Sequence, residues 1–221
     1  MDNLLYYFDI LYPFQDRVIK VISQVDTEFY LSGGTAASRG YLEHRFSDDL
    51  DYFVNDDDQF GLWTERLLQV LNSRWKCEVI QKEERFARFN IIEEENMLKI
   101  ELINDVPARV GKTQKHPILG RIDNAENILA NKITALLDRN EPKDLADIWG
   151  FCCVKGLSIH DAIVNAQGKA AGVFPADLGR ALCSVTKEDW ETIRWINRPS
   201  LDNFLSQLNK LGESLLLPGS L

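Results

Sequence analysis

The stretch GGTAASRGYLEHRFSDDLDYF, from Gly33 to Phe53, carries most of what this sequence says about its architecture. A glycine pair opens the stretch, and glycine lets a backbone approach a phosphate group without a side chain in the way. Asp49 and Asp51 close it, and carboxylate oxygens are ligands that suit Mg²⁺. The stretch therefore predicts a place for a nucleoside triphosphate (NTP) and its magnesium.

The residues around the glycine pair predict a strand, a turn and a helix. Residues 28–32 suit a short buried strand, the glycines end it, and residues 35–42 begin a helix. Backbone N–H groups at the start of a helix form an anion site, to which Thr35 adds a hydroxyl. The alternatives are a simple tight turn at the glycines and a helix cap at Thr35.

Strand alternation predicts that the two aspartates act together. In residues 49–54, alternate side chains point to opposite faces, so Leu50, Tyr52 and Val54 take the core face. Asp49 and Asp51 then share the other face, where two like charges repel unless a cation lies between them. The alternative is a solvated strand end followed by acidic helix caps.

A third carboxylate is expected on a neighbouring strand if two metal ions are used. In residues 97–103 the leucines and isoleucine at 98, 100 and 102 share one face, which leaves Lys99 and Glu101 on the other. Glu101 is therefore a candidate metal ligand. The alternative is that it only pairs with Lys99 on an exposed sheet face.

A second cluster of charges lies in NKITALLDRNEPKDLADIWG, residues 131–150. Lys132 and Arg139 are seven residues apart and project from one side of a helix, so they can reach a triphosphate. Asp144 or Asp147 can hold these cations in place. The alternative is a solvated helix pair with ordinary ion pairs.

The rest of the chain predicts an α+β fold, with a small mixed sheet, flanking helices and a helical C-terminal half. We expect a nucleotide-binding domain at 1–122 and a helical domain at 123–221 that closes on the active site. The predicted elements are an amphipathic helix at 3–24 broken near Pro13, a helix after the Asp56–Asp58 cluster to about Trp75, antiparallel strands at 77–81, 85–92 and 97–103, a long connection at 104–122, and helices thereafter.

Composition sets the expected surroundings. The net charge of −9 disfavours general nucleic-acid binding, because nucleic-acid backbones repel an acidic chain. The start of the chain is not a convincing signal peptide, no stretch suits a membrane span, and the four cysteines predict reduced thiols. We therefore expect a cytoplasmic protein. A basic segment is either an RNA contact or a charged solvent loop, and comprises Arg109, Lys112, Lys115, His116 and Arg121.

Four segments in this order resemble the nucleotidyltransferase family of abortive-infection toxins, the AbiEii/AbiGii type: LSGGTAAS, HRFSDDLDYF, KIELI and NKITALLDRNEPKDLADIWG. The resemblance covers residues 29–150. The family is similar to the wider polymerase-beta-like nucleotidyltransferases, which implies a minimal mixed sheet and a helical C-terminal half. Two departures stand out: Gly-Gly-Thr replaces a common Gly-Ser, and the third carboxylate is Glu101 where aspartate is frequent.

The resemblance also implies roles for individual residues. Gly33 and Gly34 fall on the phosphate-proximal turn, and Asp49 and Asp51 on the metal-binding pair. Lys132 falls on a lysine that contacts the triphosphate. The remaining matched positions are the later motif aspartate, Asp144 or Asp147, and the block before the aspartate pair, in which Arg45 and Ser47 contact phosphate or order the loop.

These observations predict magnesium-dependent nucleotidyl transfer from an NTP, with two ions held by Asp49, Asp51 and Glu101, and Lys132 and Arg139 on the departing phosphates. The resemblance implies a toxin with a cognate antitoxin, and an acceptor that is tRNA or another cellular target. A protein or small acceptor fits the acidic chain as well. The alternatives are a non-catalytic nucleotide- or partner-binding module and a small-molecule, drug-modifying nucleotidyltransferase.

Overall fold

The computed structural model describes residues 3–216, which form two compact units. The first, called the sheet unit, comprises the described residues up to Ala36 together with Ser47–Pro107 and Lys112–Asp123. The second, called the helical unit, comprises Ala37–Phe46, Ala108–Gly111 and the described residues from Asn124 onward. The chain therefore crosses between the units several times.

A seven-stranded mixed sheet forms the sheet unit, with the order β3-β4-β5-β2-β1-β7-β6. Its central strand β2 pairs antiparallel with β1 and parallel with β5, and β1 pairs parallel with β7. The strand bounds are β1 Tyr30–Ser32, β2 Leu50–Asn55, β3 Lys76–Lys82, β4 Phe86–Glu93, β5 Asn96–Asp105, β6 Gln114–His116 and β7 Gly120–Ile122. The predicted α+β class and mixed sheet are confirmed.

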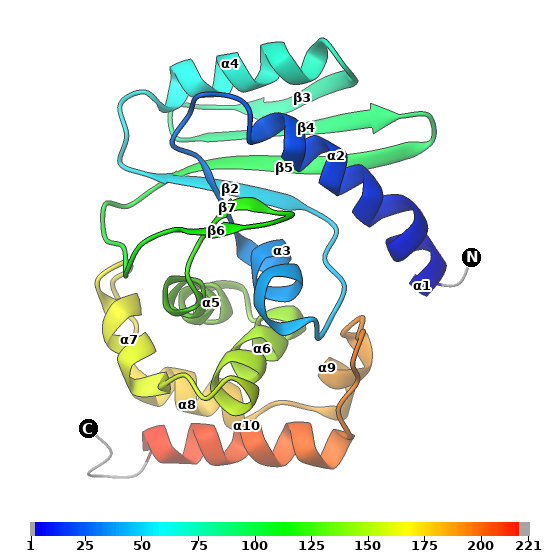
Figure 1. Ribbon diagram of the computed structural model, residues 1–221. Helices are drawn as coiled ribbons and strands as arrows, with labels where there is room; N and C mark the ends of the chain where they lie inside the picture. Colours follow the sequence, from blue (N-terminus) through cyan, green and yellow to red (C-terminus); the bar gives the residue numbers. More distant parts are fainter. Residues whose placement is uncertain (1–2, 217–221) are drawn as a thin grey trace. The chain divides into compact units, whose positions relative to one another are not determined.

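Alternation along the central strands separates a core face from a polar face. Leu50, Tyr52 and Val54 of β2 are buried, as predicted, while Asp51 between them is only half-buried. Strand β5 alternates in the same way, with Leu98, Ile100 and Leu102 fully buried. Two long helices cover the sheet and pack against each other, α2 (Tyr12–Ile22) and α4 (Phe60–Asn72) (Figure 1).

Two predictions for the sheet unit need correction. The N-terminal helix is not broken near Pro13: α1 (Asn3–Leu5), a π-helical turn η1 (Tyr6–Leu11) and α2 run on without interruption. Pro13 comes just after the π-helical turn, in which the Tyr12 N–H donates to the Tyr7 carbonyl five residues back, so the regular α-helical hydrogen bonding that a proline interrupts is already absent there. The predicted connection at 104–122 contains β6 and β7, whose antiparallel pairing extends the sheet past β1. Strands this short leave little periodicity to read.

The helical unit is built from helices, as predicted for the chain after Asp123. Its principal helix α5 packs against α6, α7 and α8, and α8 packs against α10 (Figure 1). Trp149, Trp195 and Phe204 meet edge to face in its core. The bounds are α5 Ala125–Arg139, α6 Pro142–Trp149, a π-helical turn η3 Gly150–Val154, α7 Ile159–Gln167, α8 Pro175–Cys183, α9 Lys187–Thr192 and α10 Leu201–Leu216.

Helix α3 (Gly33–Ala37) and the π-helical turn η2 (Ser38–Leu42) follow β1 directly. The predicted helix at 35–42 is therefore present and begins two residues earlier, at Gly33. Across residues 3–216, none of the helices has the length and apolar character that crossing a bilayer requires.

Candidate active site

On the polar face of the sheet, a row of polar side chains is formed by residues that lie directly opposite one another on neighbouring strands. Asp51 of β2 lies opposite Glu101 of β5 on one side and Ser32 of β1 on the other. Glu101 in turn lies opposite Arg88 of β4. Since neighbouring strands are about 5 Å apart, four side chains from four strands share a small area. The structure thus brings Asp51 and Glu101 together on neighbouring strands, whereas the alternation pattern predicted only the face on which each lies.

Gly33 makes room for the Asp51 carboxylate. A Cβ on Gly33 would collide with the Asp51 carboxylate oxygen and lie 2.9 Å from its Cβ. The φ of Gly33 is also +63°, a left-handed conformation that costs other residues about 1–2 kcal/mol. Two independent requirements therefore select glycine here.

We expect Gly33→Ala to lower the rate of the reaction at this site at least tenfold, because the added methyl group would displace the Asp51 carboxylate. The matched control is Gly156→Ala, at a φ of +75° with open space around the added Cβ. Both variants carry the backbone cost of about 1–2 kcal/mol, which urea unfolding measures. Equal activity in the two variants would show that the space beside Asp51 is unimportant.

Thr35 and Ser47 tie the segment before the aspartates to α3. The Thr35 hydroxyl donates to the Asp49 carbonyl at 2.5 Å and lies 3.0 Å from the Ser47 hydroxyl. Gln15 of α2 donates to the carbonyls of Ser47 and Asp48 at 3.2 and 2.9 Å. Both hydroxyls are buried, so this arrangement orders the loop that carries Asp49.

Lys99 links two of the three predicted metal ligands. Its ammonium lies 2.7 Å from Asp49 Oδ2 and 3.3 Å from Glu101 Oε1. Burial works against the charged lysine, but the two carboxylates prevail and raise the pKa of Lys99. Among residues 3–216, no three His, Cys, Asp or Glu side chains gather as a metal-binding set. The predicted three-carboxylate site is therefore not preformed.

A buried carboxylate that the sequence did not single out lies beside the glycine turn. Asp123 follows β7 and is fully buried, and the Ser32 hydroxyl donates to its Oδ2 at 2.9 Å. Its backbone N–H donates to the Leu31 carbonyl at 2.8 Å. In the sequence, Asp123 is only an aspartate that follows a segment predicted as a loop. Its place beside the glycine turn follows from the pairing of β1 with β7.

In the helical unit, five predicted residues meet in one ionic cluster centred on Asp147. Asp147 is fully buried and accepts from Arg45 Nε and Nη2 at 2.8 and 2.7 Å. Lys132 Nζ lies 2.8 Å from its Oδ2. Although burial favours the neutral acid, Arg45 and Lys132 hold the pKa of Asp147 well below its usual range.

Asp144 is the second carboxylate of this cluster. Its carboxylate accepts from Lys132 Nζ at 3.0 Å and from Arg139 Nε and Nη2 at 2.8 and 3.0 Å. Burial disfavours the charged form of Lys132, yet Asp147 and Asp144 raise its pKa, so it stays an ammonium. Lys132 is 5% exposed, whereas the side chain of Arg139 is 41% exposed. Arg139 is thus the more accessible cation.

His44 is the sixth member of the cluster. Its Nε2 lies 3.0 Å from Asp147 Oδ1, and because a carboxylate only accepts, Nε2 carries the proton. Burial lowers the pKa of His44, and the nearby Arg45 and Lys132 act in the same direction, against the opposing effect of Asp147. The imidazole is therefore neutral at pH 7.

We expect the stability of the protein to fall as the pH drops below about 6.5, because His44 then binds a proton in the unfolded state but not in the folded state. His44→Gln keeps a donor for Asp147 and removes the titration. Urea unfolding at pH 7.5 and 5.5 should show a larger loss in the wild type than in the variant. Equal losses would contradict this assignment.

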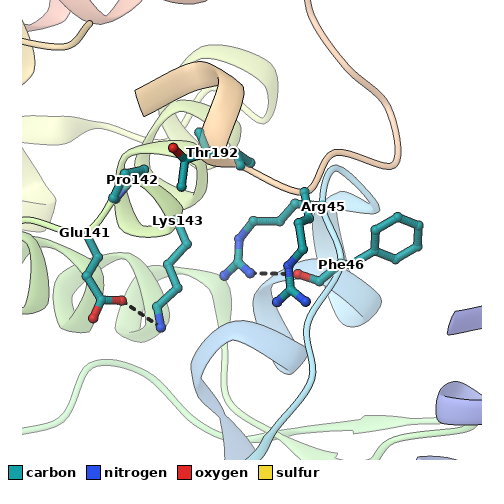
Figure 2. Close-up of a pocket in the computed structure, with 8 residues that line it drawn as sticks. Arg45, Phe46, Glu141, Pro142, Lys143 and Thr192 are labelled. Carbon is teal, nitrogen blue, oxygen red and sulfur yellow. Dashed lines mark hydrogen bonds and ion pairs between the residues drawn. The ribbon is translucent and has the colours of Figure 1, made fainter. Parts of the chain in front are cut away.

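A cavity of about 310 Å³ lies beside the cluster within the helical unit. Figure 2 shows Arg45, Glu141 and Lys143 at this cavity, with the Lys143 ammonium directed at Glu141. That ion pair measures 2.7 Å and lowers the pKa of Glu141. The lining residues are Arg45, Phe46, Glu141, Pro142, Lys143, Thr192, Ile193 and Arg194.

The predicted site residues therefore fall into two groups. The sheet unit holds the metal-ligand candidates and the residues of the glycine turn, namely Gly33, Gly34, Thr35, Ser47, Asp49, Asp51 and Glu101. The helical unit holds the phosphate-contact candidates Arg45, Lys132 and Arg139, together with the aspartates predicted to hold these cations in place, Asp144 and Asp147. Within each group the structure brings together side chains from several elements.

A family profile described as "Nucleotidyl transferase AbiEii toxin, Type IV TA system" matches residues 18–192. The chain belongs to this family. The nucleotidyltransferase activity that the motifs predicted is thus the activity of its family, and the match includes the glycine turn, the aspartate pair and the ionic cluster. A comparison with curated proteins finds no match.

Two solved structures from Helicobacter pylori have the same fold as this member of the AbiEii family. JHP933 superimposes with a TM-score of 0.65 at 19% identity, covering 97% of this chain and 93% of its own. A protein described as a "putative nucleotidyltransferase" gives 0.64 at 19% identity, covering 97% and 96%. At this identity the likeness establishes the fold alone, and it extends over the helical segments beyond the family match.

Proposed function

We propose that this AbiEii-family chain transfers a nucleoside monophosphate from an NTP to an acceptor, with its chemistry at Asp49 and Asp51. The observation that carries the proposal is the polar row on the sheet, in which Gly33 leaves room for the Asp51 carboxylate. The acceptor hydroxyl oxygen bonds to the α-phosphorus, its proton passes to solvent, and the bond to pyrophosphate breaks.

The donor set fits magnesium. Asp49 and Asp51 supply carboxylate oxygens, and a lysine ammonium already neutralises part of this site, which indicates a place built for a cation. When bound, the ion neutralises the triphosphate and lowers the pKa of the attacking hydroxyl. Thr35 and Ser47 hold the loop of Asp49 in position, and positioning together with electrostatic stabilisation supplies most of the catalysis in phosphoryl transfer.

We propose that the ionic cluster of the helical unit is a binding place for phosphate groups. Arg139 offers the accessible guanidinium, and Lys132 and Arg45 are oriented by Asp144 and Asp147. With Glu141, which lies next to Arg139, and its partner Lys143, four cations face three carboxylates, so the cluster carries excess positive charge that suits phosphate groups. Whether the acceptor is tRNA, another RNA, a protein or a small molecule is an outcome of the experiment below.

The test incubates the protein with each labelled NTP, magnesium, and in turn total tRNA, a protein extract and a panel of small hydroxylated molecules. We expect label in one acceptor class with one preferred NTP. Nucleotide binding without transfer to any acceptor would favour the non-catalytic module. Transfer to a small molecule alone would favour the drug-modifying alternative.

The family description also motivates a cellular proposal, in which the chain acts in the cytoplasm as the toxin of a pair. Expression should arrest growth, and coexpression of a cognate antitoxin, expected from the adjacent gene, should restore it. If expression of the active enzyme leaves growth unchanged, the toxin role is contradicted, while the proposed nucleotidyl transfer is not.

A further inference from the structure

Lys99 lies between two carboxylates of the candidate active site. Its ammonium contacts Asp49 at 2.7 Å and Glu101 at 3.3 Å. The strand register produces this position, because Asp49 and Lys99 each come directly before one member of the pair Leu50 and Ile100. One side chain therefore bridges the aspartate before β2 and the glutamate of β5.

Glu101 is held by a second cation as well. Arg88 Nε donates to Glu101 Oε1 at 2.8 Å, and this is the same oxygen that Lys99 contacts. Arg88 and Glu101 are direct partners in the β4–β5 pairing. A divalent ion placed on Glu101 would meet two positive charges at close range, where repulsion between like charges is strongest.

The charge of this group suits one divalent ion better than two. Lys99 and Arg88 pair with Asp49 and Glu101, and Asp51 lies opposite Glu101, so these five side chains carry one net negative charge. One divalent ion changes the net charge to +1 before the triphosphate arrives. A second ion would raise the net charge to +3, beside the ammonium of Lys99.

We propose that Lys99 is a built-in counter-cation of the active site, which takes the place of a second metal ion between Asp49 and Glu101. The site then binds a single divalent ion at Asp49 and Asp51. Glu101 anchors Lys99 and Arg88 and is not a metal ligand. This inference rests on the proposed function, because it concerns the same site, and it replaces the two-ion expectation drawn from the sequence.

The experiment counts Mn²⁺ bound to the full chain without nucleotide, by titration with electron paramagnetic resonance of the free ion. We expect one ion per wild-type chain, lost in Asp51→Asn. Lys99→Met frees two carboxylates from their cation and should bind two ions. Lys99→Arg keeps the charge and should bind one. The matched control is Lys82→Met, which removes a cation paired with Glu65 elsewhere in the sheet unit and should bind one.

Two ions on the wild type, or one ion on a folded Lys99→Met, would overturn the inference. Because the wild-type count alone can contradict it, the inference is tested even if Lys99→Met does not fold. A wild type that binds no Mn²⁺ also overturns it. Failure of the proposed function would have a different result, because no label would then be transferred from any NTP.

Discussion

Replacing Asp51 by alanine should reduce nucleotidyl transfer by about a hundredfold or more, because the loss of a carboxylate proposed to hold the metal ion should raise the barrier by several kcal/mol. Asp51 lies at the centre of the polar row, between Glu101 and Ser32. Its loss removes one of the two carboxylates proposed to hold the ion. Initial rates with the labelled NTP measure the effect.

The fold should tolerate this change, since Asp51 lies on the half-buried face and the core side chains of β2 are untouched. The matched control is Asp26→Ala, which removes an equally charged but fully exposed carboxylate from the same unit and should keep full activity. Undiminished transfer by Asp51→Ala, with the fold intact by circular dichroism, would remove Asp51 from the mechanism.

Replacing Asp147 by alanine should destabilise the helical unit by about 3–5 kcal/mol, the usual cost of removing one partner from a buried ion pair. Arg45 and Lys132 would keep their charges in a site that is almost closed to water. Removing a carboxylate whose folded pKa is depressed takes away stability that is present at neutral pH and lost in acid. Urea unfolding at pH 7 measures the change.

Two further variants separate this effect from the loss of an ordinary ion pair. Asp177→Ala removes the partner of Arg180 on the surface of α8 and should cost less than about 1 kcal/mol. Asp147→Asn keeps the volume and loses the charge, so it should fall between the two alanine variants. An Asp147→Ala protein as stable as Asp177→Ala would contradict a buried cluster that depends on charge balance.

Most of the predicted strands have enough residues to show alternation, whereas β1 has only three and was predicted because the glycine pair marks its end. Strands β2, β4 and β5 each have six or more residues, and their buried positions repeat every second residue. Strands β6 and β7 have three residues each and were read as a loop. Their place in the sheet depends on pairing between Leu31 and Ile122, which are far apart in the sequence.

In the candidate site, too, local patterns could be predicted and contacts between distant residues could not. Alternation placed Asp51 and Glu101 on faces of strands, and helical spacing placed Lys132 and Arg139 on one side of α5. Neither pattern reveals that Asp147 binds Arg45, because 102 positions separate them. Nor did the pattern distinguish Glu101 as a metal ligand from Glu101 as a partner of Lys99, an alternative that the structure makes concrete.

By itself, the sequence from Gly33 to Phe53 determined the strand, the turn and the aspartate pair, because local backbone geometry follows from residues close together in the chain. The tertiary structure decided which charges meet. Gly33 faces Asp51, Lys99 bridges Asp49 and Glu101, and Arg45 is buried against Asp147. The physical reason is that an ion pair depends on distance in space, and strand register and helix packing set those distances.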